Sequence, residues 1–223
     1  DKFVIMATAN GTVKKTSLDQ YSRPRSVGLR AVDLVEGDHL VDTAIIDGSQ
    51  NIMLFSSEGK AVRFSETDVR AMGRVSKGVR GMRLPENHSV ISMVIPELDG
   101  FLLTVCENGY GKRTKVDEFP TKGRGGKGMI AIQASERNGP LVGATQLFSG
   151  DEIMLISDQG TMVRTRGDEV SVVGRNTQGV RIIRLKENEN LVSLARIAEP
   201  EEDDFVESES ESDSGEVEDA ATD

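Results

Sequence analysis

The sequence predicts an all-β protein made of four repeated units, each with four short strands. Two observations support this prediction. Landmarks recur about every fifty residues, and each unit opens with an apolar run followed by a turn that ends in glycine. No segment keeps an apolar period of 3.6 residues, so we expect little helix.

Turn glycines mark the start of each unit, at positions spaced 48, 50 and 51 residues apart: Gly11, Gly59, Gly109 and Gly160. Glycine supplies the positive φ angle that tight hairpin turns need. We therefore expect a hairpin in every unit. The first strands are predicted at 3–7, 52–55, 101–105 and 153–156, and the second at 12–16, 61–64, 111–114 and 161–165.

A second glycine series is spaced 50, 50 and 51 residues apart, at Gly28, Gly78, Gly128 and Gly179. It predicts a third strand, for example at 79–84 and 180–185, and a fourth strand follows at 40–46 or 90–95. Four strands in each unit of about fifty residues are typical of a propeller-like ring. Four units either close such a ring or leave strand edges exposed.

The charge is divided unevenly along the chain. The net charge is −10, but residues 199–223 hold thirteen acidic and no basic residues, which leaves 24 acidic against 27 basic residues, or +3, over 1–198. We expect one domain at 1–198, with units at about 1–50, 51–99, 100–150 and 151–198. Residues 199–223 should form a disordered acidic tail.

Composition excludes several classes of site. The single cysteine, Cys106, lies in an apolar run and excludes an internal disulfide or a Cys-rich zinc site. His39 and His88 are expected in solvated loops, and neither Tyr21 nor Tyr110 has the surroundings of a catalytic tyrosine. No apolar stretch is long enough to span a bilayer. We therefore expect a cytoplasmic chain with no catalytic or metal site.

Basic residues recur at fixed positions in the units, one of them four residues after each turn glycine. Equivalent positions of a ring fall on one circumference, so the pattern predicts a basic belt that binds a bent polyanion. The alternative is that these charges only keep exposed strands soluble. The candidate binding residues are Lys14, Lys15, Arg23, Arg25, Arg30, Arg63, Arg74, Lys77, Arg80, Lys112, Arg113, Lys122, Arg124, Lys127, Arg164, Arg175 and Arg181.

Three runs show a resemblance to a known family: MATANGTVKKT at 6–16, NGYGKRT at 108–114 and VGRNTQGV at 173–180. They resemble the C-terminal domain of the A subunit of bacterial DNA gyrase, and the likeness extends over residues 2–198. The resemblance implies a β-pinwheel, a propeller variant in which neighbouring blades exchange strands. It also implies that a basic perimeter wraps double-stranded DNA and so supports ATP-dependent negative supercoiling.

The resemblance also implies partners. The ATPase subunit, together with the rest of the A subunit, would complete an A2B2 heterotetramer in the bacterial nucleoid, with ATP and Mg²⁺ on those other domains and no cofactor here. Six blades are usual in the family, with a gyrase box, Gln-Arg-Arg-Gly-Gly-Lys-Gly, in the first. The four repeats here resemble the last four, and residues 122–128 match the box at five of seven positions.

Two alternative functions stay open. One is the equivalent domain of the topoisomerase IV A subunit. The other is a propeller scaffold that binds proteins, for which charge would be unrelated to blade position. The acidic tail is either a solubilising appendage or a competitor that visits the basic belt and weakens DNA binding.

Overall fold

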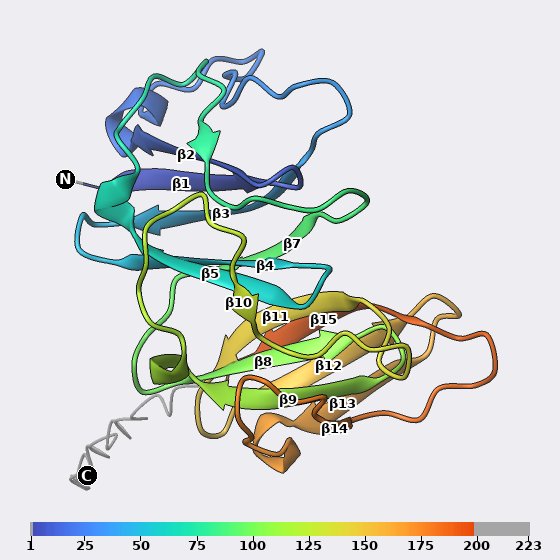
Figure 1. The fold of residues 1–223 in the computed structure, drawn as a ribbon. Coiled ribbons are helices and arrows are strands. Elements are labelled where there is room, and N and C mark those ends of the chain that lie inside the picture. Colours follow the sequence, from blue (N-terminus) through green and yellow to red (C-terminus); the bar gives the residue numbers. More distant parts are fainter. Residues whose placement is uncertain (1, 199–223) are drawn as a thin grey trace, which may run out of the picture.

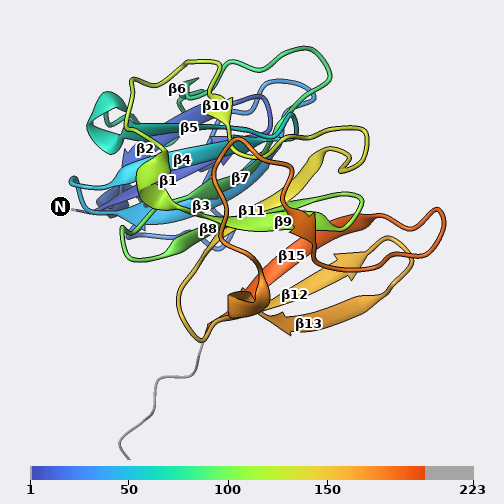
Figure 2. The same ribbon diagram turned by 60° about the horizontal axis from the view of Figure 1, so that its bottom comes forward.

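The computed structural model describes residues 2–198, which form four antiparallel sheets in an open arc (Figure 1). The first and fourth sheets lie at opposite ends of the arc in both views (Figures 1 and 2). Within these residues the only helices are single 3-10 turns, and none is long or apolar enough to cross a membrane. The all-β prediction is confirmed. The predicted disordered tail lies outside the described residues.

Each sheet is built around the predicted hairpin. The first strands are β1 (Phe3–Thr8), β4 (Asn51–Ser56), β8 (Phe101–Cys106) and β12 (Glu152–Ser157). The second strands are β2 (Thr12–Ser17), β5 (Lys60–Ser65), β9 (Tyr110–Lys115) and β13 (Met162–Arg166). A 3-10 turn follows each second strand: η1 (Leu18–Tyr21), η2 (Glu66–Asp68), η3 (Val116–Glu118) and η4 (Gly167–Glu169).

The strand that ends each unit forms the inner side of the arc. These inner strands are β3 (Leu40–Ile46), β7 (Val90–Val94), β11 (Leu141–Leu147) and β15 (Leu191–Ile197). Each pairs with the first strand of its own unit, and consecutive inner strands contact one another from blade to blade. The opposite edge of each sheet therefore lies on the outer perimeter.

The predicted third strand is shorter than expected and belongs to the preceding sheet. It consists of two residues in β6 (Val79–Arg80), β10 (Met129–Ile130) and β14 (Val180–Arg181), which pair with β2, β5 and β9. The exchange of strands between neighbouring blades is thus confirmed. We call the chain from each 3-10 turn to this outer strand a crossing segment: 69–80, 119–130 and 170–181.

The two ends of the arc lack this exchange. Residues 22–39 of the first unit contain no strand, and β13 has no outer partner among residues 2–198 (Figure 2). The side chains of β13 are half-buried or exposed, whereas those of β2, β5 and β9 are buried over four consecutive positions. Burial of a second strand therefore depends on the crossing segment of the next unit.

The hydrophobic core is divided among the three contacts between sheets. Along β4, Ile52 and Leu54 pack towards the first sheet, whereas Met53 and Phe55 pack towards the third. Because strands present alternate side chains to opposite faces, a strand between two sheets needs an uninterrupted apolar run. Cys106 belongs to the second of these cores, where burial raises the pKa of its thiol to about 12.

The turn glycines have a second role beyond their positive φ. A Cβ on Gly59 would lie 2.4 Å from the carbonyl oxygen of Ile132, because the chain that follows a crossing segment passes against the turn. Gly160 adopts nearly the same φ, +81° against +82°, but a Cβ there would meet nothing within 4 Å. The fourth blade therefore provides a natural control for the effect of this chain on the turn.

We expect Gly59→Ala to destabilise the protein by about 3–5 kcal/mol, because it adds a backbone clash to the left-handed strain. Gly160→Ala should cost only the strain, about 1–2 kcal/mol. Urea unfolding of the two variants measures the difference. Equal losses would contradict a packing role at these turns for the chain that follows each crossing segment.

Candidate nucleic-acid interface

The predicted belt on the second strands is wrong for five of its residues, because their side chains are buried between blades. Lys15, Arg63 and Arg113 occupy equivalent positions and are 7–9% exposed. Lys14 and Lys112, each one residue earlier, are 1% and 0% exposed. A side chain enclosed in this way cannot contact a DNA phosphate.

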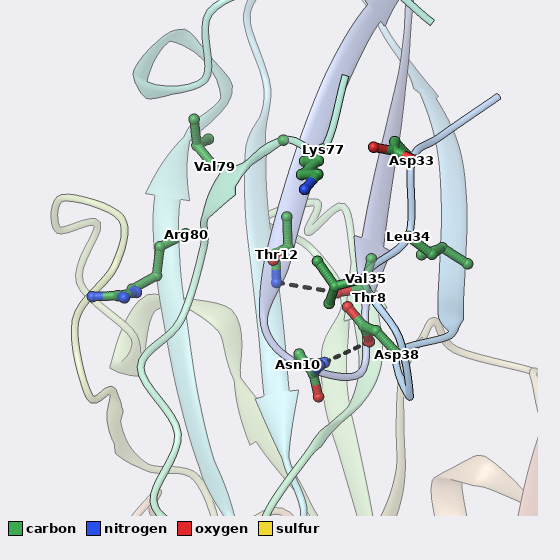
Figure 3. A pocket seen from close by; sticks show the side chains of 11 residues that line it. Thr8, Asn10, Thr12, Asp33, Leu34, Val35, Asp38, Lys77, Val79 and Arg80 are labelled. Atoms are coloured by element: carbon green, nitrogen blue, oxygen red, sulfur yellow. Dashed lines mark hydrogen bonds between the residues drawn. The ribbon is translucent and has the colours of Figure 1, made fainter. Parts of the chain in front are cut away.

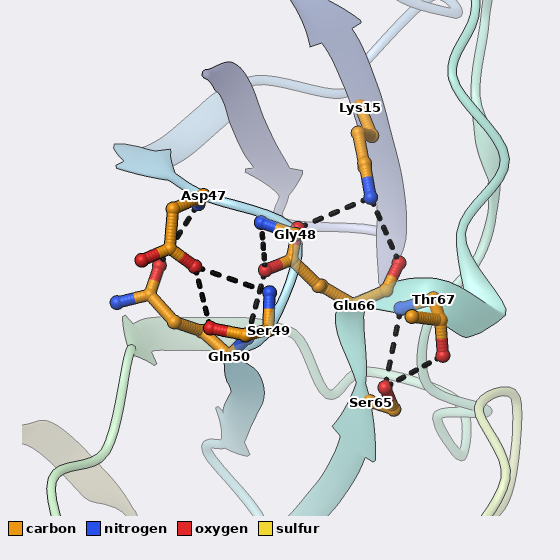
Figure 4. A network of polar contacts seen from close by, with 8 residues as sticks. All are labelled: Lys15, Asp47, Gly48, Ser49, Gln50, Ser65, Glu66 and Thr67. Atoms are coloured by element: carbon orange, nitrogen blue, oxygen red, sulfur yellow. Dashed lines mark hydrogen bonds and ion pairs between the residues drawn. The ribbon is translucent and has the colours of Figure 1, made fainter. Parts of the chain in front are cut away.

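Lys15 connects the first blade to the second (Figure 4). Its Nζ lies 3.1 Å from Oε2 of Glu66, which is fully buried at the start of η2. The other carboxylate oxygen accepts hydrogen bonds from the backbone amides of Gly48 and Gln50, both at 2.8 Å. One ion pair thus joins β2, η2 and the loop between the two blades.

Arg63 and Arg113 make the same connection with other acceptors. Nη1 of Arg63 donates to the carbonyls of Val116 and Phe119, at 3.2 and 3.0 Å. Arg113 pairs with Asp168 at 2.7 Å, and its Nε donates to the carbonyl of Val170 at 2.8 Å. In each case the acceptors belong to the 3-10 turn of the next blade or the residue after it. The recurring base therefore joins consecutive blades.

Arg164, the recurring base of the fourth blade, is exposed, and the reason shows what buries the other three. Its blade is the last in the described arc, and the arginine pairs with Glu152 of its own sheet. Its side chain is 58% exposed, against 9% for Arg113. The repeated base is buried wherever a following blade covers it and exposed where none does. Sequence spacing located the position correctly but could not indicate which face of the blade it occupies.

Lys14 and Lys112 anchor the crossing segments from beneath. Nζ of Lys112 donates to the carbonyls of Gly174 and Arg175, at 2.7 and 2.5 Å, and to Thr177 Oγ1 at 3.1 Å. Lys14 bonds in a similar way to the carbonyls of Ala31 and Arg74. Burial lowers the pKa of both ammonium groups to about 8. The two lysines hold loops whose outer sides face solvent.

The other twelve predicted residues lie on the perimeter or at the ends of the arc, and most are exposed. Ten are exposed, whereas Arg74 and Arg175 are half-buried. All but Arg164 come from the crossing segments and their counterpart in the first unit. The twelve are Arg23, Arg25, Arg30, Arg74, Lys77, Arg80, Lys122, Arg124, Lys127, Arg164, Arg175 and Arg181.

Three of these arginines also hold neighbouring crossing segments together. Four residues before the second glycine of the second, third and fourth units, an arginine Nη1 donates to a backbone carbonyl of the preceding unit. Arg74 bonds to Arg30 at 3.3 Å, Arg124 to Arg80 at 2.9 Å, and Arg175 to Ile130 at 2.8 Å. This bonding orders the perimeter and uses part of the hydrogen-bonding capacity of these side chains.

Six of these twelve residues have no ion pair or side-chain hydrogen bond within residues 2–198: Arg23, Arg25, Lys77, Arg80, Lys122 and Lys127. Figure 3 shows two of them beside a hollow of about 280 Å3 in the first blade. Asp33 and Asp38 line this hollow together with Lys77, whereas the side chain of Arg80 points away from it. Arg80 is thus free to meet an anion, and the hollow itself has mixed charge.

Arg137 was not predicted among the candidate binding residues. Arg137 stacks over the ring of Tyr110, with its Cζ 4.3 Å from the ring centroid. Arg181 approaches the same tyrosine and donates to its Oη at 2.6 Å. Arg137 was missed because its counterparts in the other units, such as Asn87 and Asn188, are not basic. A search for recurring charge cannot find a residue that occurs once.

We expect Lys15→Met to destabilise the protein by about 3–5 kcal/mol, because it leaves the carboxylate of Glu66 buried without its cation. Arg164→Met removes a base from the equivalent position and should cost less than about 1 kcal/mol, since this pair is solvent-exposed. Chemical denaturation compares the two. If the two substitutions cost the same, the joining role of this position is refuted.

The lowered pKa of Lys112 predicts a pH dependence. Between about 8 in the folded protein and 10.5 in the unfolded chain, the unfolded state binds more protons, so the contribution of Lys112 to stability rises with pH. Relative to Lys112→Met, the wild type should gain up to about 1.4 kcal/mol per pH unit across this window. Denaturation of both proteins from pH 7 to 10 measures the gain. A constant difference would contradict the burial of this ammonium group.

Comparison with known proteins agrees with this architecture. The family model described as "DNA gyrase C-terminal domain, beta-propeller" matches residues 2–47, 50–97, 100–146 and 151–198, one segment for each sheet. A solved structure of a DNA gyrase A C-terminal domain superposes with a TM-score of 0.79 at 27% identity, covering 89% of this chain and 66% of that one. The C-terminal domain of a DNA topoisomerase IV gives 0.83 at 25% identity, with coverages of 88% and 62%.

Curated relatives are closer in sequence. The A subunit of DNA gyrase from Salmonella typhimurium is 56% identical over 201 residues, and that from Pseudomonas aeruginosa is 59% identical over 198 residues. These alignments cover 90% and 89% of this chain but only 23% and 22% of the relatives. Four sheets that exchange outer strands, the four matched segments and these identities lead to one conclusion: the chain belongs to the family of DNA gyrase C-terminal β-propeller domains.

Proposed function

We propose that residues 2–198 bind double-stranded DNA along the outer perimeter of the arc, as a non-catalytic part of the DNA gyrase A subunit. The observation that supports this most directly is the set of exposed, unpaired bases on successive crossing segments. Lysine and arginine side chains that neutralise phosphates release counterions and bind duplex DNA without reading its sequence. The relatives are named as A subunits of DNA gyrase, which supports DNA as the partner.

The shape of the perimeter favours bent DNA. Crossing segments follow one another around the outside of a curved row of blades, so a duplex that contacts several of them must curve. The cost of bending is offset by the additional phosphate contacts that wrapping allows. In this proposal, wrapping presents DNA to the rest of the enzyme and supports ATP-dependent negative supercoiling.

The remaining parts of the enzyme belong to the proposal as well. The ATPase subunit, together with the rest of the A subunit, would supply strand cleavage, ATP and Mg²⁺ in an A2B2 assembly on the bacterial chromosome. Topoisomerase IV is the second candidate, supported by the TM-score of 0.83 with its C-terminal domain. Identities of 56% and 59% to the A subunits of two DNA gyrases favour gyrase.

A protein-binding scaffold is less well supported by the distribution of exposed apolar side chains. Nine of the eleven such residues in the described part of the chain lie in the first and fourth units, at the two ends of the arc. They are Val27, Leu34, Val35, Leu40 and Ile45 at one end, and Met162, Val172, Val180 and Val192 at the other, whereas Val75 and Leu98 lie in the second unit. The crossing segments 69–80 and 119–130 therefore carry one such residue, Val75, which leaves this part of the perimeter to DNA.

To test DNA binding, we would compare two double variants that each remove two exposed positive charges. Lys122→Gln/Lys127→Gln alters a crossing segment, and Arg184→Gln/Lys186→Gln alters the loop that leads to inner strand β15. If each perimeter lysine neutralises one phosphate, the first variant should lower the slope of log K against log salt by about 2, and the second should leave it unchanged. Fluorescence anisotropy with duplex DNA measures the slope.

Equal slopes for the wild type and Lys122→Gln/Lys127→Gln would refute the perimeter as the binding surface. Energy transfer between dyes at the two ends of a duplex would separately measure bending. Binding without a shorter end-to-end distance would leave a DNA-binding domain but refute wrapping by this chain.

A further inference from the structure

The second blade lacks an internal cation that its two neighbours have. Lys14 and Lys112 occupy the same position of the first and third blades, and each ammonium group bonds to carbonyl oxygens of the crossing segment above it. The equivalent residue of the second blade is Val62. Valine fills little of the space that a lysine side chain would occupy and cannot donate a hydrogen bond.

The space that results is a cavity of about 220 Å3 beneath the crossing segment 119–130. Val62 lies on its wall, and Gly123, Gly126 and Gly128 line the side formed by the crossing segment. Gly123 is the counterpart of Gly174, whose carbonyl accepts from Lys112. Within residues 2–198, no hydrogen bond to the carbonyl of Gly123 or Arg124 is recorded.

We propose that this cavity binds a primary alkylammonium group, which takes the place of the missing lysine side chain. The proposal goes beyond DNA binding and does not depend on it. The methylene chain of the ligand would lie against Ala61, Val62 and Met129. Its ammonium group would donate to the carbonyl oxygens that the neighbouring blades offer to Lys14 and Lys112.

The missing lysine and the carbonyls of Gly123 and Arg124 that are unpaired within residues 2–198, rather than the charge of the lining, argue for an amine. A divalent metal ion prefers carboxylate oxygens, and no carboxylate of residues 2–198 lines this cavity. Arg63, Lys122 and Lys127 also line it and could attract an anion, so phosphate is the competing ligand. The neighbouring blades hold an ammonium group close to Arg74 and Arg175, so nearby arginines do not prevent a cation from binding in such a cradle.

The test uses n-butylammonium, which reproduces the lysine side chain, and the full 223-residue chain. Titration should shift the amide NMR signals of Gly123, Gly126 and Gly128 in a saturable way, with half-saturation on the order of millimolar for so small a ligand. At ten times the dissociation constant, hydrogen exchange of these amides should slow about tenfold. Tetramethylammonium at equal concentration supplies the charge without an N–H donor and should have no such effect.

Two substitutions should abolish the response for different reasons. Val62→Lys supplies a tethered ammonium group, so exchange in the crossing segment should already be slow without added amine. Val62→Met fills the cavity without a donor, so exchange should stay fast and the amine should have no effect. Val163→Lys is the matched control, because residue 163 is the equivalent position of the fourth blade, which no crossing segment within residues 2–198 covers.

The proposal is overturned if inorganic phosphate, rather than the amine, shifts the three glycine signals. It is also overturned if Val62→Met responds to the amine as the wild type does, or if Val163→Lys slows exchange at 123–128 as much as Val62→Lys. Because Val62→Met replaces one apolar side chain by another, it tests the site even if the buried charge of Val62→Lys prevents folding.

Discussion

Every blade except the last is completed by the chain of the next one, and the other features of the structure depend on this exchange. The hairpin of a unit supplies a second strand with one edge unpaired. The crossing segment of the following unit pairs with that edge and covers the strand's side chains, and the residues just after it pack against the turn glycine. Without a crossing segment in the described arc, as at β13, the edge is open and Arg164 is exposed.

Positive charge in this chain serves two purposes that a linear sequence does not separate. In the first three blades, the recurring base of the second strand lies between blades, where it pairs with Glu66, Asp168 or backbone carbonyls. Bases on the crossing segments face solvent, and some of them also bond to the preceding segment. Lys14 and Lys112 link the two groups, because they are buried themselves yet hold the loops that present exposed charge.

Equivalent positions of the blades share a backbone geometry but differ in their side chains and in the groups that these contact. Three equivalent bases use three acceptors: a buried carboxylate, a pair of carbonyls and a partly exposed aspartate. Position 62 carries valine where its neighbours carry lysine, which leaves a cavity beneath the crossing segment of that blade. Repeats that share one backbone can therefore diverge in what lies beneath their loops.

The sequence alone determined the number of units, their hairpins and the glycine turns, because these depend on contacts between residues close together in the chain. Alternation and turn chemistry are local, and four copies made them easy to recognise. The recurrence of basic residues was equally visible. Their division into buried and exposed groups was decided only by tertiary structure, since a crossing segment about sixty residues further along, such as that bonded to Lys112, determines which side chains it covers. The resemblance to a known family supplied the exchange of strands, but Lys15, Arg63 and Arg113 could be placed between blades only once η2, η3 and η4 were seen beside them.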